Sequence, residues 1–142
     1  MSPSPREARG ALVKRQSRPL PAEVIHDRLC SEVIDGALAV QTALGPFYDA
    51  ALYRNALAVE LRRRGIACHK NVKLTVTFRS EVVGSFEADL VVDEQILVKL
   101  TADGHLDPRH KDQVLRGLGA SGLRLGLLLD FGGPELQFSR IL

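Results

Sequence analysis

One carboxylate and one ammonium group stand at a spacing that could do chemistry. Asp89 lies in a predicted strand, and Lys99 and Thr101 follow on one face of the next predicted strand. If the chain turns at residues 93–95, Asp89 faces Lys99 and Glu87 faces Thr101. Directly opposed residues of an antiparallel pair have Cβ atoms about 5 Å apart. The pattern therefore predicts an ion pair between Asp89 and Lys99.

The sequence lacks the other common arrangements of catalytic residues. It contains no GxGxxG or Walker A loop, no HExxH and no GxSxG motif. The four histidines are scattered, and the two cysteines, Cys30 and Cys68, belong to no CxxC or Cys/His cluster. Two isolated cysteines favour a reducing, cytoplasmic location over a disulfide-stabilised secreted protein.

Length and composition exclude several classes of protein. The 142 residues, 45% of them apolar, can form one modest hydrophobic core. No run approaches the roughly 18 uncharged apolar residues that a membrane-spanning helix needs, so we expect no membrane partner. A multidomain enzyme, a collagen-like chain and a membrane protein are all excluded.

The positive charge is concentrated at the beginning of the chain. Residues 1–21 carry five basic residues and one acidic residue, a net charge of +4, which leaves −2 for residues 22–142. Four prolines and no apolar periodicity predict a flexible tail. The tail is a candidate contact for nucleic acid or another anionic surface, and a solvated tail without a partner is the open alternative. The candidate contact residues are Arg6, Arg9, Lys14, Arg15 and Arg18.

Residues 22–142 are predicted to form one α/β domain with the element order ααβββαββ. Apolar residues at helical spacing predict helices over residues 22–44, from about residue 48 to residue 65, and over residues 107–120. Alternating apolar residues predict a half-buried strand over residues 72–79. In the second strand the alternation places Phe86, Ala88, Leu90 and Val92 on one face. Three further strands are expected over residues 96–100, 123–129 and 136–142.

The segment from about Glu23 to Leu142 resembles the GxxExxY family of the PD-(D/E)XK nuclease-like superfamily. No single motif carries the resemblance; the ordered set does. Its pieces are Leu44-Gly45-Pro46, Tyr53, Ala56-Leu57, Glu60-Leu61, Arg64-Gly65, Ala88-Asp89-Leu90-Val91-Val92, His110, Gln113 and Gly126-Leu127-Leu128-Leu129-Asp130-Phe131-Gly132. The resemblance implies a mixed central sheet flanked by helices.

The resemblance also implies a metal site in active relatives. There a strand Asp, a Glu ten residues later and a helix Glu bind Mg²⁺-type ions, and a Lys two residues beyond the strand Glu stabilises charge. In this chain Asp89 keeps the Asp position, Lys99 stands at the Glu position and Thr101 at the Lys position. The namesake Glu falls on Ala50 and the namesake Gly on Phe47, whereas Tyr53 is retained.

These substitutions predict a neutralised site without metal or other cofactor. Glu87 could supply a second carboxylate, and Asp49 could do so if the helix rotated by one residue. His110 and Gln113 match family residues on a helix that faces the site, or are ordinary polar packing.

Three functions follow as hypotheses. The first is a catalytically inactive nuclease-fold protein that acts by binding or by homo-oligomeric, structural assembly. The second is a Mg²⁺-dependent DNA or RNA endonuclease with a migrated site built on Asp89, Glu87 and Lys99. The third is a nucleic-acid-binding module that uses the basic tail. The negative charge of residues 22–142 favours the first hypothesis, because nuclease grooves need a basic surface.

Overall fold

The computed structural model describes residues 22–142, with side chains from Asp27 onward. The basic residues Arg6, Arg9, Lys14, Arg15 and Arg18 therefore lie outside the described residues. The elements follow the order ααβββαββ, which confirms the predicted order. Their bounds are α2 Ala22–Leu44, α3 Ala50–Arg63, β1 Cys68–Phe78, β2 Glu81–Val92, β3 Ile96–Thr101, α4 Pro108–Ser121, β4 Leu125–Asp130 and β5 Gln137–Ile141.

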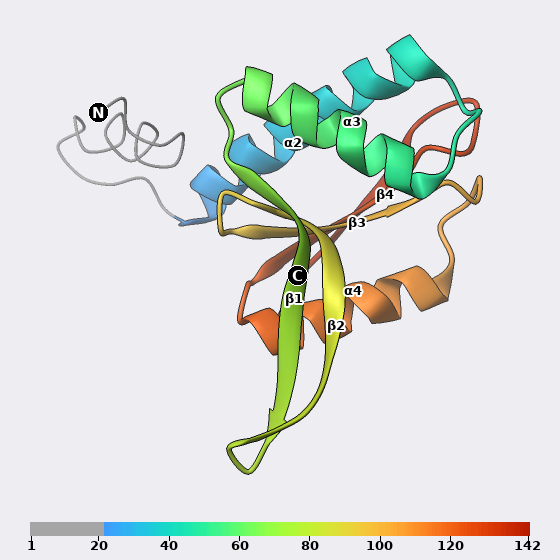
Figure 1. Ribbon diagram of the computed structural model, residues 1–142. Coiled ribbons are helices and arrows are strands. Elements are labelled where there is room, and N and C mark those ends of the chain that lie inside the picture. Colours follow the sequence, from blue (N-terminus) through green and yellow to red (C-terminus); the bar gives the residue numbers. More distant parts are fainter. Residues whose placement is uncertain (1–21) are drawn as a thin grey trace, which may run out of the picture.

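The five strands form one mixed sheet in the order β1-β2-β3-β4-β5. Strands β3 and β4 are parallel, and the other neighbours are antiparallel. Helices α2 and α3 cover one face and α4 covers the other (Figure 1). Strand β4 is buried along its whole length, as its continuous apolar run predicts. The result is the three-layer arrangement expected of an α/β domain.

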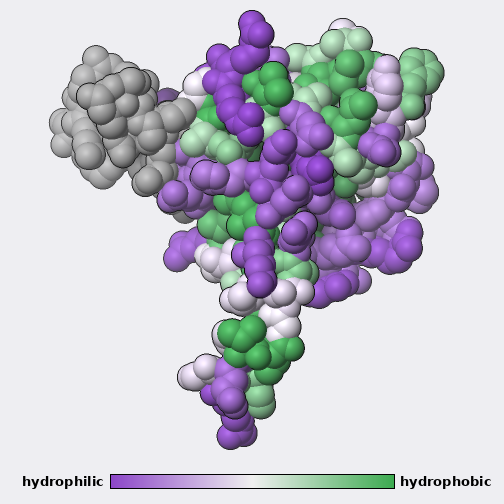
Figure 2. All heavy atoms as spheres, viewed as in Figure 1, coloured by the Kyte–Doolittle hydropathy of each residue, from purple (hydrophilic) through white to green (hydrophobic). Residues whose placement is uncertain are grey.

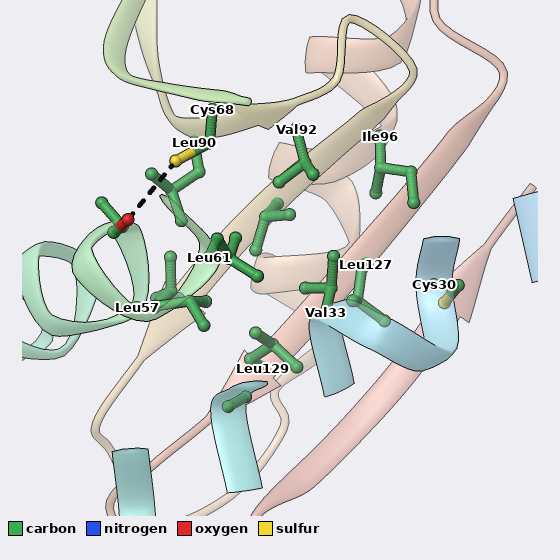
Figure 3. Packing of buried hydrophobic residues seen from close by; sticks show 14 of the residues in the cluster. Cys30, Val33, Leu57, Leu61, Cys68, Leu90, Val92, Ile96, Leu127 and Leu129 are labelled. Carbon is green, nitrogen blue, oxygen red and sulfur yellow. Dashed lines mark hydrogen bonds between the residues drawn. The ribbon is translucent and has the colours of Figure 1, made fainter. Parts of the chain in front are cut away.

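Two clusters of buried apolar side chains fill the two sides of the sheet. The larger lies under α2 and α3 and includes Leu57, Leu61 and Leu127, which point toward one another in Figure 3. Cys68 Sγ lies 3.8 Å from the Ala58 carbonyl oxygen in this layer. Burial raises the pKa of the Cys68 thiol, and of the Cys30 thiol, so both cysteines stay protonated at neutral pH.

Helix boundaries follow local sequence. Helix α2 ends at Leu44 because Gly45 takes a left-handed φ of 71° and Pro46 cannot continue the ladder. Helix α3 begins after Asp49, whose carboxylate accepts a hydrogen bond from the Leu52 N–H at 3.0 Å. Helix α4 begins after its N-cap residue Asp107, with a proline in its first turn. No helix in residues 22–142 is long and apolar enough to cross a membrane.

The prediction of apolar faces in the first two strands was wrong in part. Phe86 and Ala88 pack in the cluster beside α4, whereas Leu90 and Val92 pack beneath α2 and α3. The face of β2 therefore changes at Asp89. Strand β1 changes face at the opposite position, where Asn71 has a φ of 54°. This kink interrupts the strict alternation on which the prediction depended.

The outer part of the first hairpin also departs from prediction. Leu74 is buried, but Val76 and Phe78 are 39% and 62% exposed, although all three were expected on one buried face. The hairpin of β1 and β2 extends beyond α4 and projects from the body of the protein (Figure 1). Apolar alternation correctly predicted a strand here, but nothing covers its outer half among the described residues.

Candidate functional site

The centre of the site is a fork between β2 and β3. The ladder between them holds only three pairs, and it ends at Leu90 and Val98. The predicted register is confirmed as far as Leu90 and Val98, but beyond this point Asp89 forms no ladder pair with Lys99. Instead, Asp89 Oδ2 accepts a hydrogen bond from the Leu100 N–H at 2.9 Å. The carboxylate thus takes the place of a backbone acceptor where the two strands diverge.

Lys99 completes this arrangement. Its Nζ lies 3.6 Å from the same oxygen, Asp89 Oδ2, and the two side chains are 31% and 24% exposed. The predicted ion pair is therefore present, although the side chains meet across the fork and not across a ladder. A partly exposed pair of this kind contributes less than about 1 kcal/mol to stability. Its consequence is electrostatic, because a positive charge already occupies the space beside the carboxylate.

Glu87 does not lie opposite Thr101, as the sequence predicted. Glu87 pairs with Lys73 in the β1–β2 ladder, and Thr101 pairs with Asp130 in the parallel β3–β4 ladder. The reason is the kink at Asp89, which carries the outer half of β2 away from β3. Glu87 still lines a cleft of about 220 Å³ beside Asp89 and Lys99.

A second cleft, of about 460 Å³, brings together most of the other predicted site residues. Ala50 reaches it from the start of α3, Lys99 and Thr101 from β3, and His110 and Gln113 from α4. Lys99 and Gln113 line both clefts. Asp89, the carboxylate that the resemblance places at a metal-binding position, lines the first cleft and not this one.

Asp49 lines this second cleft but is already engaged. Its carboxylate caps α3 through the Leu52 N–H, as described above. A rotation of the helix that turned Asp49 inward would break this cap. Within residues 22–142, no group of three or more His, Cys, Asp or Glu side chains is arranged to hold a metal ion.

His110 has a clear structural role at the start of α4. Its Nδ1 accepts a hydrogen bond from the Asp107 N–H at 3.2 Å, in a reciprocal capping arrangement. Because Nδ1 accepts, Nε2 carries the ring proton, and it lies 3.2 Å from Asp103 Oδ2. Both nitrogens of this buried ring are therefore used. The cap Asp107 also binds the Arg109 N–H and guanidinium, which lower the pKa of its carboxyl.

Tyr53 positions the loop that leads into α3. Its fully buried ring stacks on Phe131 with the ring centres 4.6 Å apart. The Tyr53 hydroxyl donates to the Gly45 carbonyl oxygen and accepts from the Tyr48 N–H at 3.3 Å. These bonds hold the turn that precedes Ala50. Phe47, which the GxxExxY resemblance would align with a Gly, is 81% exposed on the same loop.

Sequence reasoning gave Asp130 no role of its own in the site. Asp130 is fully buried, and its Oδ1 accepts from the Gly104 and Gly132 N–H groups at 3.1 and 3.3 Å. A Cβ on Gly132 would lie 2.2 Å from the Ala102 carbonyl oxygen. The two residues fasten the loop between β3 and α4, which sets the position of His110. The signal in the sequence that could have identified Asp130 is an acidic residue at the end of an apolar run, followed by Phe-Gly.

The comparisons with known proteins give one match. The model of the PD-(D/E)XK nuclease superfamily matches residues 27–141. No curated protein and no solved structure matches the chain. The match covers the whole sheet and every described site residue, and the mixed sheet between helices is consistent with the nuclease fold. The chain therefore belongs to the PD-(D/E)XK nuclease superfamily.

Proposed function

We propose that the chain is a GxxExxY-type protein whose nuclease site has degenerated, and that it acts by binding or by homo-oligomeric assembly instead of cutting nucleic acid. The observation that carries this proposal is the contact between Lys99 Nζ and Asp89 Oδ2 at 3.6 Å. The ammonium group stands beside the one carboxylate retained from the family's metal site.

The chemistry of Mg²⁺ supports this proposal. The ion needs hard oxygen ligands, and protein sites supply them through carboxylates. Here Asp89 Oδ2 already accepts the Leu100 N–H and faces the Lys99 ammonium, while the Asp49 carboxylate caps a helix. A divalent cation would have to approach a resident positive charge. Without the metal, no group in the cleft would activate water for attack on phosphate.

A second candidate, a metal-dependent endonuclease, rests on one observation. Glu87, Asp89 and Lys99 line the same 220 Å³ cleft, so two carboxylates and a lysine share one wall. Glu87 is exposed and Asp89 is paired, so this arrangement requires both side chains to move before they hold Mg²⁺. We therefore rank it second.

Two further expectations complete the proposal. The basic residues of the tail, such as Arg6 and Arg18, would provide an anion contact, and removal of residues 1–21 would then abolish binding of nucleic acid. Two buried thiols with raised pKa values suit a reducing cytoplasm.

A cleavage assay tests the ranking of the two candidates. Supercoiled DNA, single-stranded DNA and RNA are incubated with the full chain and Mg²⁺ or Mn²⁺. We expect no cleavage by the wild type, by Asp89→Asn or by the control Asp112→Asn, which changes an exposed acid on α4. Metal-dependent cleavage that Asp89→Asn abolishes and Asp112→Asn retains would refute the proposal and establish the endonuclease.

A further inference from the structure

The projecting hairpin carries an exposed apolar surface. Past Leu74 the side chains of Val76, Phe78, Val82 and Val83 are 39%, 62%, 66% and 63% exposed. Figure 2 shows hydrophobic atoms gathered on this projection, with hydrophilic residues at its tip. We call residues 72–86 the arm. Apolar side chains gathered on a projecting element mark an interaction surface.

The arm has a free edge along β1, and the extended part of that strand has Thr75 at its midpoint. Strand β1 is at the end of the sheet, and no described strand pairs with its outer edge. The extended part of β1 runs between two residues of left-handed backbone, Asn71 with φ 54° and Arg79 with φ 50°. Thr75 is the midpoint of this segment. An unprotected edge strand is a template for pairing with another strand.

We propose that the arm is a dimerisation surface, in which β1 pairs antiparallel with β1 of a second copy and Thr75 lies on the two-fold axis. In this register Leu74 lies opposite Val76 of the second copy, and Val72 lies opposite its Phe78. The two sheets join into one continuous sheet. This inference names the assembly contact left open by the proposed function and rests on it for its biological role.

The side-chain pattern fits this register, which the position of Thr75 midway between Asn71 and Arg79 favours. Val72 and Leu74 pack on the α4 side of the sheet, and Val76 and Phe78 follow at the same period of two. With Thr75 on the axis, these apolar positions face one another, and Lys73 faces Thr77 of the second copy. An axis at Lys73 would oppose two ammonium groups, which is unfavourable.

The same pattern suits a second copy as the occupant. A two-fold interface requires that one surface complement itself. The segment from Val72 to Phe78 fulfils this requirement, since it carries only one charge, Lys73, and the axis at Thr75 leaves that charge opposite a neutral residue. The paired edges would also satisfy the outward backbone groups of both copies.

Charge variants of the full chain test the register by sedimentation velocity over a concentration series. We expect a monomer–dimer equilibrium. Thr75→Lys and Thr75→Glu place like charges opposite each other and raise the dissociation constant about fivefold. Thr77→Glu, the matched control, faces Lys73 of the second copy and lowers the dissociation constant. Because Thr75 and Thr77 are exposed, all three variants are expected to keep the wild-type circular dichroism.

Cross-linking gives an independent readout. Thr75→Cys should form a disulfide between copies on mild oxidation, whereas Ser85→Cys, the ladder partner of Thr75 in β2, should not. A monomer at every concentration, or a dimer that ignores both Thr75 variants, would overturn the inference. A dimer lost on deletion of residues 1–21 but unaffected by the Thr75 variants would assign the contact to the tail and also overturn it. DNA cleavage by an arm-paired dimer would refute the proposed function and leave this inference standing.

Discussion

Lys99 Nζ lies 3.6 Å from Asp89 Oδ2, and the same oxygen accepts the Leu100 N–H at 2.9 Å. Asp89, which the resemblance places at a metal-binding position of active relatives, therefore makes structural contacts in this chain. It closes the fork between β2 and β3 and neutralises the lysine beside it.

The two partners of Asp89 should contribute unequally to stability. Asp89→Ala leaves the Leu100 N–H without its acceptor and should cost about 1–3 kcal/mol. Lys99→Met removes only a partly exposed ion pair and should cost less than about 1 kcal/mol. Urea denaturation measures both free energies of unfolding. Equal losses in the two variants would mean that the backbone hydrogen bond contributes little.

The hydroxyl of Tyr53 should contribute to the stability of the fold. Tyr53→Phe removes the bonds to the Gly45 carbonyl and the Tyr48 N–H and should cost about 1–2 kcal/mol. Tyr48→Phe is the control, because it removes a hydroxyl from a ring that is 45% exposed. We expect the control to stay within about 0.5 kcal/mol of the wild type in thermal or urea unfolding. A similar loss in both variants would contradict the assigned role of Tyr53.

The residues that the site requires could be predicted only in part from the sequence. The pairing of Asp89 with Lys99 followed from spacing and chemistry, and the structure confirms it. The predicted ladder between β2 and β3 was too long, because it was extended past the kink at Asp89. In the structure this kink accompanies the positive φ of Asn71, which lies opposite Asp89 on β1. Periodicity cannot detect such a kink, since the residue types on either side still alternate.

Exposure and loop structure were harder to predict for a different reason. Residues such as Val76 and Phe78 are typical of a buried strand face. They are exposed here because α4 ends before it reaches them and nothing else in the described chain covers them. The role of His110 as a reciprocal cap depends on the ring position relative to Asp107. These properties arise from tertiary packing, which a single sequence does not specify.

Gly132 provides a test of the loop that precedes α4. Gly132→Ala would place a Cβ 2.2 Å from the Ala102 carbonyl oxygen, so the backbone must shift, at a cost of about 1–3 kcal/mol. The matched control is Gly119→Ala on α4, where a new Cβ would meet no atom within 4 Å. This change should raise the free energy of unfolding by about 0.5–1 kcal/mol. Both values come from urea denaturation. Tolerance of the Gly132 change would show that the loop is not held as described.

Asp107 should contribute to the acid sensitivity of the protein. Hydrogen bonds from the Arg109 N–H and guanidinium lower the pKa of Asp107 in the folded state. Its contribution is therefore complete above the unfolded pKa of about 3.9 and is lost as the pH falls through the lower folded value. We expect Asp107→Asn to flatten the loss of stability at acid pH, measured by unfolding over a pH series. An unchanged slope would contradict this assignment.

The most direct test of the central claim is a calorimetric titration of Mg²⁺ into the wild type and into the triple variant Ala50→Glu/Lys99→Glu/Thr101→Lys. These three residues line one cleft, and the variant restores the acids and the lysine of the family pattern. The control triple Ala50→Gln/Lys99→Gln/Thr101→Lys has the same shape without the new carboxylates. We expect saturable heat only in the Glu variant, and we expect it to be lost again when Asp89→Ala is added. Saturable Mg²⁺ binding by the wild type that Asp89→Ala abolishes would show that the Lys99 ammonium does not keep the metal out.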